Sequence, residues 1–488
     1  MVAILCILLF FKYGPLFGRS FFPETSSIGQ FLVSIPLPVG ISFFTFQGIS
    51  LVVEAYKGKQ IEEYDAIVVR GIARHGLRIA AFKAFFPQLV AGPVVTAHEF
   101  LPQVRTKYFK DINWNSAFAS LVVGYFLKMV IADNLKDQTF WVTFPYFRDM
   151  HSITLVVLLF GYSFQIFSDF AGYSLIAIGL AKLFGYDFPT NFNFPYISTT
   201  FAEFWRRWHI SLSTFLRNFL YIPLGGNRKG GFHTYKNLML TMVLGGLWHG
   251  AAWSYAVWGF FHGLVLALER LLKDAGWKVR LPAAIHMLFI FCMVTLAWLL
   301  FKLPEFSHVV EYMRCLFTNT HIANLQPLIL FFTILFSIPA IIYHLMHLWT
   351  RKPQPLLTRI KPVLYGIMLF LILVNSGGGA SFIYFQFCPT YAPPFAHRLR
   401  DPRGRICPVH QVRQAGVEHR AAPGQRQSHQ CGTIRIRARG PGCDGDRGFI
   451  AFVPYRDGQP ASTYQQSELR WAHGVRWSRT GAPFGEKA

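Results

Sequence analysis

Charged side chains are scarce in this chain. Asp, Glu, Lys and Arg account for 15% of its 488 residues, whereas about 25% is usual in a soluble domain. Hydrophobic residues account for 52%, and phenylalanine alone occurs 50 times. This composition excludes an ordinary soluble domain. It predicts an all-α polytopic membrane protein, because helices satisfy their own backbone hydrogen bonds in lipid.

The motifs of two common kinds of catalytic site are also missing. The seven cysteines include no CxxC pair, so neither a zinc site nor a disulfide framework is indicated. The sequence has no HExxH segment and no serine in a GxSxG setting. We therefore predict no bound metal, and we expect neither a covalent serine hydrolase nor a zinc enzyme.

Acidic residues are about half as numerous as basic ones, 24 against 47, and the formal net charge is +23. Such an excess can indicate nucleic-acid binding, but here the basic residues form short clusters between apolar runs. Basic clusters beside membrane spans usually mark the cytoplasmic side. We therefore predict the lipid bilayer as partner, no nucleic acid, and cytoplasmic loops at residues 57–59, 70–83, 105–110, 206–207 and 228–236.

Several segments are apolar enough to enter a membrane, although some are shorter than the roughly 20 residues that a simple span needs. Segment 31–53 contains Pro36, Pro38 and Gly40, which should break a helix there. Broken helices are tolerated at membrane depth only where protein or a water-filled cavity covers the backbone. We expect an irregular helical assembly with an internal cavity, built from segments 31–53, 117–132, 153–167, 173–183, 238–268, 283–301, 327–348 and 362–374.

The two ends of the sequence differ from its middle. Residues 1–11 are apolar but too short for a full span, and we expect them to end a helix that begins further upstream. From residue 388 the apolar runs stop, and 15 arginines occur with one lysine. We predict a membrane domain over 1–387 and an Arg-rich, disordered tail over 388–488. The tail resembles the translation of a shifted, GC-rich reading frame; a genuine basic cytoplasmic tail is the alternative.

One histidine, His249, lies inside the apolar segment 238–268. An ionisable side chain at membrane depth is costly and by default indicates a functional site. Imidazole titrates near neutral pH, so the functional interpretation is a general base. The alternative is a histidine hydrogen-bonded between packed helices. Gly245, Gly246 and Gly250 remove side chains around it, which favours close helix approach or ligand access.

A second histidine, His209, belongs to an amphipathic stretch over 200–219. Thr200 and Glu203 fit a capping box, in which each side chain satisfies a free backbone N–H at a helix start. Apolar residues recur at helical spacing on one face, namely Phe204, Trp208, Leu212 and Phe215. We expect one helix that lies in the membrane interface or lines a cavity. His209 is then either an interfacial residue or a partner of His249.

Three further features each allow two interpretations. Trp205 and Trp208 are interface anchors or a stacking platform. The glycine-rich turn 225–231, with its basic residues, is a tight turn or a phosphate site, although it lacks the residue order of a P-loop. Asp169 lies among apolar residues and needs a partner; of a structural and a catalytic role we expect the structural one, in which it holds an arginine or a histidine in place.

Six motifs follow one another along the chain: FPQLVAGP (86–93), SDFAGY (168–173), NFNFPY (191–196), FWRRWHISLS (204–213), YIPLGGN (221–227) and GGLWHG (245–250). Together they resemble the membrane-bound O-acyltransferase (MBOAT) family. The resemblance is greatest to its bacterial branch of alginate O-acetyltransferase membrane subunits and D-alanyl-transfer relatives. It extends over about residues 1–387, and members of this branch usually start with further membrane helices and often end near residue 387. We therefore expect a chain truncated at its N-terminus and altered at its C-terminus.

The resemblance implies an MBOAT-type ring of transmembrane helices around a central tunnel, with re-entrant and amphipathic segments. It also implies that His249 is the catalytic residue and His209 the second active-site histidine. His249 would accept the proton of an acceptor hydroxyl as it attacks a thioester, while His209 orients a substrate or stabilises developing charge. Within the same motifs we predict substrate contacts by Trp205, Arg206, Trp208, Asp169 and Asn227.

The function that the resemblance implies is acetyl transfer from cytoplasmic acetyl-CoA across a bacterial inner membrane, for O-acetylation of an exopolysaccharide such as alginate. Acetyl-CoA is then a substrate, and no cofactor stays bound. Periplasmic acetyltransferase partners would place the acetyl group on the polysaccharide acceptor. The alternatives are D-alanyl or other acyl transfer to a cell-envelope polymer, and a non-catalytic export or scaffold subunit.

Overall fold

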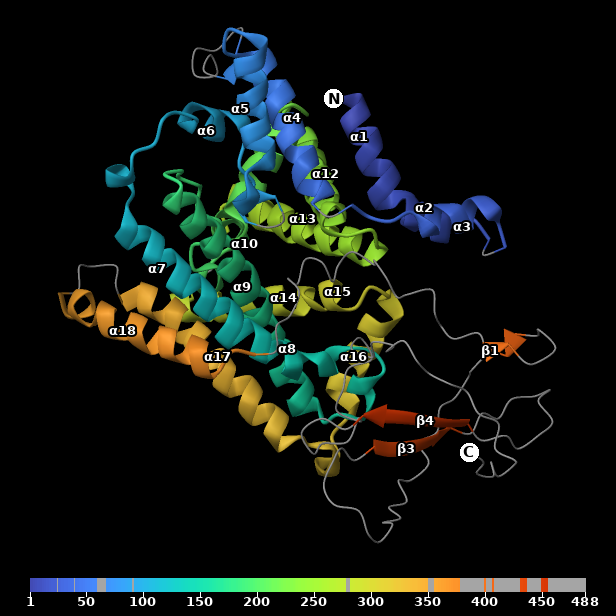
Figure 1. The fold of residues 1–488 in the computed structure, drawn as a ribbon. Coiled ribbons are helices and arrows are strands. Elements are labelled where there is room, and N and C mark those ends of the chain that lie inside the picture. Colours follow the sequence, from blue (N-terminus) through green and yellow to red (C-terminus); the bar gives the residue numbers. More distant parts are fainter. Residues whose placement is uncertain are drawn as a thin grey trace, which may run out of the picture. The chain divides into compact units, whose positions relative to one another are not determined.

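A computed structural model describes residues 1–377 except 24, 39, 59–66, 90–91, 278–280 and 350–354, and four short strands further on. The chain divides into two compact units, Met1–Thr390 and Tyr391–Ala488. The described part of the first unit is helical (Figure 1). This confirms the predicted all-α membrane fold for the first unit, while the ring and its tunnel stay predictions.

In the second unit the structure describes two strand pairs. Strand β1 (Leu399–Arg400) pairs antiparallel with β2 (Ile406–Cys407). Strand β3 (Cys431–Ile436) pairs antiparallel with β4 (Phe449–Pro454), with Cys431 opposite Pro454. Most of the Arg-rich tail lies outside the described residues, so the prediction about its order stays a prediction.

The N-terminal helical stretch is longer than the sequence suggested. Helix α1 (Val2–Leu8), a π-helical turn (Leu9–Tyr13) and α2 (Gly14–Phe21) follow one another, and together they are long and apolar enough to cross a membrane. The expectation that the apolar segment stops at residue 11, too short for a span, is therefore wrong. Helix α3 (Ser27–Ser34) packs back on α2, where a Cβ on Gly18 would lie 2.9 Å from the Gly29 carbonyl oxygen.

The proline-containing segment is broken as predicted. Helix α3 ends at Ser34, residues 35–38 carry no regular structure, and α4 (Ile41–Lys57) begins after Gly40. Gly40 has a φ of 76°, and a Cβ there would lie 2.6 Å from the Leu89 carbonyl oxygen, so only glycine fits. Helices α5 (Ile72–Ala84) and α6 (Ala97–Phe100) follow, and a small apolar core around Phe82 and Phe100 joins them.

The long central helix α9 (Ser152–Leu183) has 32 residues. The sequence predicted two segments, 153–167 and 173–183, and this division is wrong. Helix α9 packs against α7 (Trp114–Tyr125), a π-helical stretch (Phe126–Ala132) and α8 (Asp133–Thr139). A Cβ on Gly172 would lie 2.8 Å from the Gly124 carbonyl oxygen, so small residues let the two backbones approach.

A buried ionic triad explains why polar residues can sit inside α9. The Lys128 Nζ lies 2.6 Å from Asp133 Oδ1 and 2.6 Å from Asp169 Oδ1, and all three side chains are buried. The expected partner of Asp169 was an arginine or a histidine, and the structure gives a lysine instead. A buried charge needs such pairing, because an isolated one is very costly in an apolar interior.

The predicted apolar segment 238–268 is two helices. Helix α12 (Gly231–His249) ends at His249, and α13 (Trp253–Asp274) begins after three residues without helical structure. The two helices pack closely, because a Cβ on Gly246 would lie 2.2 Å from the Tyr255 carbonyl oxygen. The predicted role of Gly246 in close helix approach is confirmed, whereas a single span over this segment is excluded.

The predicted helix over 200–219 is also divided. Helix α10 (Phe201–Arg207) ends before His209, which has a φ of 44°, and α11 (Ile210–Leu216) is followed by a π-helical turn (Arg217–Tyr221). The Thr200 hydroxyl accepts from Glu203 N at 3.0 Å. Glu203 itself accepts from Thr199 rather than Thr200, so the capping box is half confirmed. The predicted apolar face is confirmed, because Phe204, Trp208, Leu212 and Phe215 are all buried.

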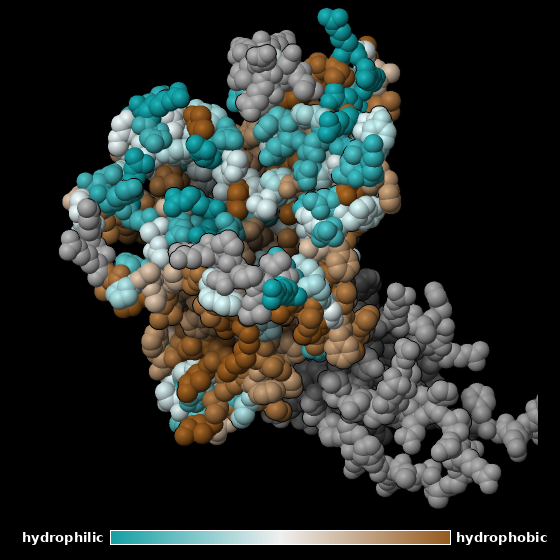
Figure 2. Space-filling model, turned by 90° about the vertical axis from the view of Figure 1, so that its left-hand side faces the viewer, coloured by the Kyte–Doolittle hydropathy of each residue, from teal (hydrophilic) through white to brown (hydrophobic). Residues whose placement is uncertain are grey.

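The remaining helices are α14 (Ala283–Ala297), α15 (Leu299–Lys302), α16 (Phe306–Thr318), α17 (Pro327–Trp349) and α18 (Pro355–Val374). Among the described residues, six helical stretches are long and apolar enough to cross a membrane: Val2–Phe21, Trp114–Val142, Ser152–Leu183, Trp253–Asp274, Ala283–Lys302 and Pro327–Trp349. Figure 2 shows hydrophobic side chains gathered in the lower half of one face, at the height where Figure 1 places α17. On α17, Leu328, Phe331 and Ile334 are exposed, as expected of a lipid-facing surface.

Candidate active site

The backbone at His209 is held in an unusual conformation by a neighbouring strap. Its φ of 44° lies in the left-handed region, which non-glycine residues rarely adopt. The strap, residues 191–193, forms two backbone hydrogen bonds around it: Asn193 N donates to Arg207 O, and Ile210 N donates to Asn191 O, both at 2.9 Å. Such strain costs on the order of 1–3 kcal/mol and persists only where the surroundings fix it. The strap therefore turns the His209 side chain inward.

The Asn191 side chain determines the tautomer of His209. Its Oδ1 lies 3.0 Å from His209 Nδ1 and also accepts from the Ser211 hydroxyl at 2.9 Å, while its Nδ2 donates to Ser174 Oγ at 3.1 Å. An amide oxygen only accepts, so His209 Nδ1 carries the proton and Nε2 carries the lone pair. In the described part of the chain, Nε2 is buried and has no hydrogen-bond partner.

Burial also determines the charge of His209. The residue is 0% exposed, and this burial lowers the pKa of its imidazole to about 3, because desolvation disfavours the charged form. At neutral pH the ring is therefore neutral and offers one hydrogen-bond acceptor, Nε2. It has no second N–H with which to stabilise a negative charge.

His249 lies beside His209. It is the last residue of α12 and is 5% exposed, and the centroids of the two imidazole rings are 6.2 Å apart. The rings of Trp258 and Phe301 pack edge-on against it at 5.4 and 5.1 Å. Two histidines far apart in the sequence thus lie side by side in one buried place among aromatic rings.

The end of α12 is held by two residues that the sequence analysis missed. The Tyr13 hydroxyl donates to the Leu247 carbonyl at 2.9 Å. Lys12 is buried, and its Nζ donates to the Trp248 carbonyl and, at 2.7 Å, to Ser42 Oγ. A cation at a helix C-terminus satisfies free carbonyls and complements the helix dipole. Lys12 and Tyr13 therefore fix the last turn of α12 and with it His249.

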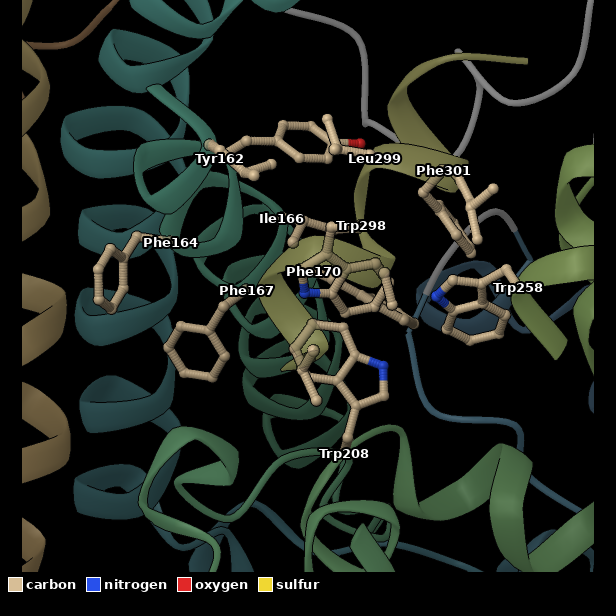
Figure 3. Packing of buried hydrophobic residues seen from close by; sticks show 14 of the residues in the cluster. Tyr162, Phe164, Ile166, Phe167, Phe170, Trp208, Trp258, Trp298, Leu299 and Phe301 are labelled. Atoms are coloured by element: carbon tan, nitrogen blue, oxygen red, sulfur yellow. The ribbon is translucent and has the colours of Figure 1, made fainter. Parts of the chain in front are cut away.

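The five predicted substrate contacts fall in different places. Trp208 is buried and packs against Trp298 at 5.0 Å, while Trp205 is half-buried and lies 5.6 Å from Trp258. Figure 3 shows Trp208 and Trp298 between Phe167 on one side and Trp258 on the other. Trp298 stacks on Trp258, which contacts His249, so the two tryptophans are connected to the histidine pair through other rings.

The other three lie elsewhere. Arg206 and Asn227 are exposed, and the described contact of Asp169 is with Lys128. Near Asn227, Asn237 Nδ2 donates to the Leu224 and Gly226 carbonyls at 3.2 and 3.0 Å. Gly225, Gly226 and Gly230 have positive φ angles there. The segment 225–231 is therefore a tight turn, which is the first of its two interpretations.

Comparison with known proteins shows the family of the chain. The model of the membrane-bound O-acyltransferase family, MBOAT, matches residues 27–300, which include both histidines. The chain is 41% identical over 309 residues to a probable alginate O-acetylase AlgI of Azotobacter vinelandii, covering 62% of this chain and 58% of that protein. It is 36% identical over 333 residues to a peptidoglycan O-acetyltransferase of Helicobacter pylori, covering 64% and 63%.

A more distant relative is a teichoic acid D-alanyltransferase of Bacillus subtilis, 27% identical over 255 residues, which cover 50% of this chain and 61% of that protein. The matched part of the chain thus spans less than two thirds of the length of these relatives. Since the family model matches more than half of the chain, the chain belongs to the membrane-bound O-acyltransferase family.

Proposed function

We propose that this protein transfers an acetyl group from a thioester donor to a hydroxyl, and that His209 and His249 form its reaction centre. The observation that carries the proposal is the buried pair of rings 6.2 Å apart, with one ring held by Asn191 in a single neutral tautomer. Two buried imidazoles side by side can bind a hydroxyl and move its proton.

In the proposed reaction His209 Nε2 accepts a hydrogen bond from a second donor group of the acceptor molecule, and so orients the reacting hydroxyl, whose own proton points to His249, toward the thioester carbonyl. His249 takes the hydroxyl proton as the new C–O bond forms. The C–S bond then breaks, and His249 returns the proton to the leaving thiolate. The Trp258 Nε1–H is buried without a described partner and can donate to the carbonyl oxygen as it becomes negative.

The donor, acceptor and partners are part of the same proposal. Acetyl-CoA reaches the centre from the cytoplasm of a bacterial inner membrane, and the acetyl group passes outward to periplasmic acetyltransferase partners that modify an exopolysaccharide such as alginate. Identity supports acetyl as the acyl group, because it is 41% and 40% to two probable alginate O-acetylases but 27% to the D-alanyltransferase of Bacillus subtilis. Substrate contacts by Trp205, Trp208, Arg206, Asn227 and Asp169 all remain predictions of the sequence.

The test uses membranes that contain the full chain. Acetyl-CoA labelled in its acetyl group is offered in one arm, and in the other a D-alanyl thioester of a carrier protein. The proposal predicts His249-dependent incorporation of label from acetyl-CoA alone. Incorporation from the D-alanyl donor alone would support the D-alanyl alternative. Incorporation from neither donor, with the chain present in the membrane, would favour a non-catalytic export or scaffold subunit.

Asn191 is expected to act as a positioning residue. In Asn191→Leu, His209 Nδ1 and Ser211 lose a shared acceptor, and a buried polar group without its partner costs about 1–3 kcal/mol. We expect acetyl incorporation to fall about 10- to 100-fold through an altered His209 orientation. Asn193→Leu is the matched control, because Asn193 is exposed in the same strap, and it should keep near-normal incorporation.

The pH profile separates positioning from a general structural role. Asn191→Leu takes away an acceptor that favours a protonated Nδ1, so the pKa of His209 should fall further, and the acid side of the remaining activity should lie at a lower pH than in the unaltered protein. Equal activity in the Asn191→Leu and Asn193→Leu variants, with unchanged pH profiles, would show that Asn191 does not position His209.

A further inference from the structure

A cavity lies away from the histidine pair. This cavity has a volume of about 400 Å³ and lies among α9, α14, α17 and the short 3-10 turn Pro195–Ile197. Its walls are mostly apolar and include Phe160, Phe164 and Phe291. A space of this size with such walls fits a hydrocarbon chain better than a polar metabolite.

The cavity is reached from the lipid side. Helices α9, α14 and α17 all belong to stretches that are long and apolar enough to cross a membrane. Ile334, Ile341 and Leu345 of α17 line the cavity and are also 49%, 37% and 55% exposed. Side chains that face both the cavity and the hydrocarbon surface make the bilayer the source of an occupant.

One polar group in the cavity is left without a partner. Thr333 and Ser337 line it, but their hydroxyls already donate to the Ile329 and Thr333 carbonyls at 2.6 and 2.7 Å. His344 is 3% exposed, and its Nδ1 lies 2.8 Å from the Ala340 carbonyl oxygen. A carbonyl only accepts, so Nδ1 carries the proton in the neutral ring. The buried Nε2 is therefore an acceptor, and it has no partner among the described residues.

The cavity is separate from the reaction centre. Tyr196 stacks on His344 at 5.3 Å and lies 6.0 Å from Trp208. Phe167 lies 4.6 Å from His344, whereas Phe170, one turn further along α9, lies 4.6 Å from His209. Figure 3 shows Phe164 and Phe167 on the opposite side of Trp208 and Trp298 from Trp258. The rings of Tyr196, Trp208 and Trp298 thus lie between the cavity and the histidine pair.

We propose that this cavity binds one acyl chain of a membrane lipid that presents a hydroxyl, and that the hydroxyl donates a hydrogen bond to His344 Nε2. From Thr333 to His344 the cavity follows α17 for about 16 Å, at about 1.5 Å per residue. His344 lies near the C-terminal end of the span, which is where lipid polar groups meet the hydrocarbon core. The chain then extends along the apolar walls toward Thr333.

The test compares two photoactivatable probes on the purified full chain in phospholipid vesicles. One is a diazirine-bearing hexadecan-1-ol, and the other is its methyl ether, which has the same chain but no donor. We expect the alcohol to label the cavity segments of α9 and α17 at least fivefold more than the ether does. Equal labelling by the two probes in the unaltered protein would overturn the proposal, and this comparison needs no variant.

Matched variants assign the labelling to the cavity and to His344. His344→Phe keeps an aromatic ring but removes the acceptor, and it should reduce labelling by the alcohol to the level of the ether. Ile341→Trp fills the cavity and should suppress both probes, whereas Ile342→Trp, at a neighbouring site 49% exposed to the outside, should suppress neither. Equal loss in the two tryptophan variants, or an alcohol preference that survives His344→Phe, would contradict the proposal.

Discussion

Replacing His249 by alanine is expected to lower acetyl transfer by at least about 100-fold, since general-base catalysis contributes about 10²- to 10⁴-fold. The ring is buried next to His209 at the end of α12. The measurement is the initial rate of label transfer from acetyl-CoA by membranes that contain equal amounts of each variant.

The control for this loss is His233→Ala. His233 is exposed near the start of the same helix, so its replacement changes the composition of α12 without touching the buried pair, and it should keep the full rate. Replacing both His209 and His249 should cost little more than replacing His249 alone, because residues that act as a unit are not additive. Fully additive losses would contradict a shared reaction centre.

The second large effect is expected at the buried triad. Lys128→Met leaves Asp133 and Asp169 without the cation that lies 2.6 Å from both. Breaking a buried ion pair from one side costs about 3–5 kcal/mol, because the remaining charge stays buried and unpaired. We expect a loss of this size in the free energy of unfolding, measured by denaturant titration of the detergent-solubilised protein.

A compensated variant tests the reason for this loss. Changing Lys128→Met together with Asp133→Asn and Asp169→Asn removes all three charges, and most of the lost stability should return. Lys182→Met is the matched control on α9, because the described partner of Lys182 is the Ser116 hydroxyl, and it should cost less than about 1 kcal/mol. A loss in Lys128→Met no larger than in Lys182→Met would show that the triad does not hold α9 in place.

Local signals in the sequence predicted several features correctly. Pro36 and Pro38 break the chain between α3 and α4 because proline cannot continue a helix interior. The spacing of Phe204, Trp208, Leu212 and Phe215 predicted a buried face, although the face is shared by two helices. These predictions depend on neighbouring residues alone, which is why one sequence was enough.

Features that depend on distant contacts were missed or misread. Ser168 and Asp169 interrupt an apolar run, yet α9 continues through them because Lys128 pairs with Asp169. The helix break at His209 depends on the strap around Asn191, which no periodicity indicates. Lys12 carried a usable signal, because a lysine in an apolar N-terminal run needs a partner, but its partner at Trp248 is visible only in the fold.

The same distinction applies to the candidate site. The sequence singled out His209 and His249 as candidate active-site residues. The structure adds the short distance between them, the tautomer of His209 and the residues that hold both side chains in place. Trp205 and Trp208 pack against Trp258 and Trp298, whereas Arg206 and Asn227 are on the surface. The sequence motifs therefore singled out candidate residues, whereas the distances between these residues depend on packing between distant segments of the chain.

The most direct test is the O-acetyl ester content of the secreted polysaccharide. Cells that lack their own membrane acetyltransferase are complemented with this chain or with its His249→Ala variant, and equal amounts in the membrane are verified for both. We predict that the unaltered chain restores O-acetyl esters and that the variant does not. Restoration by both chains would contradict His249 as the catalytic residue, and restoration by neither would contradict acetyl transfer by this chain.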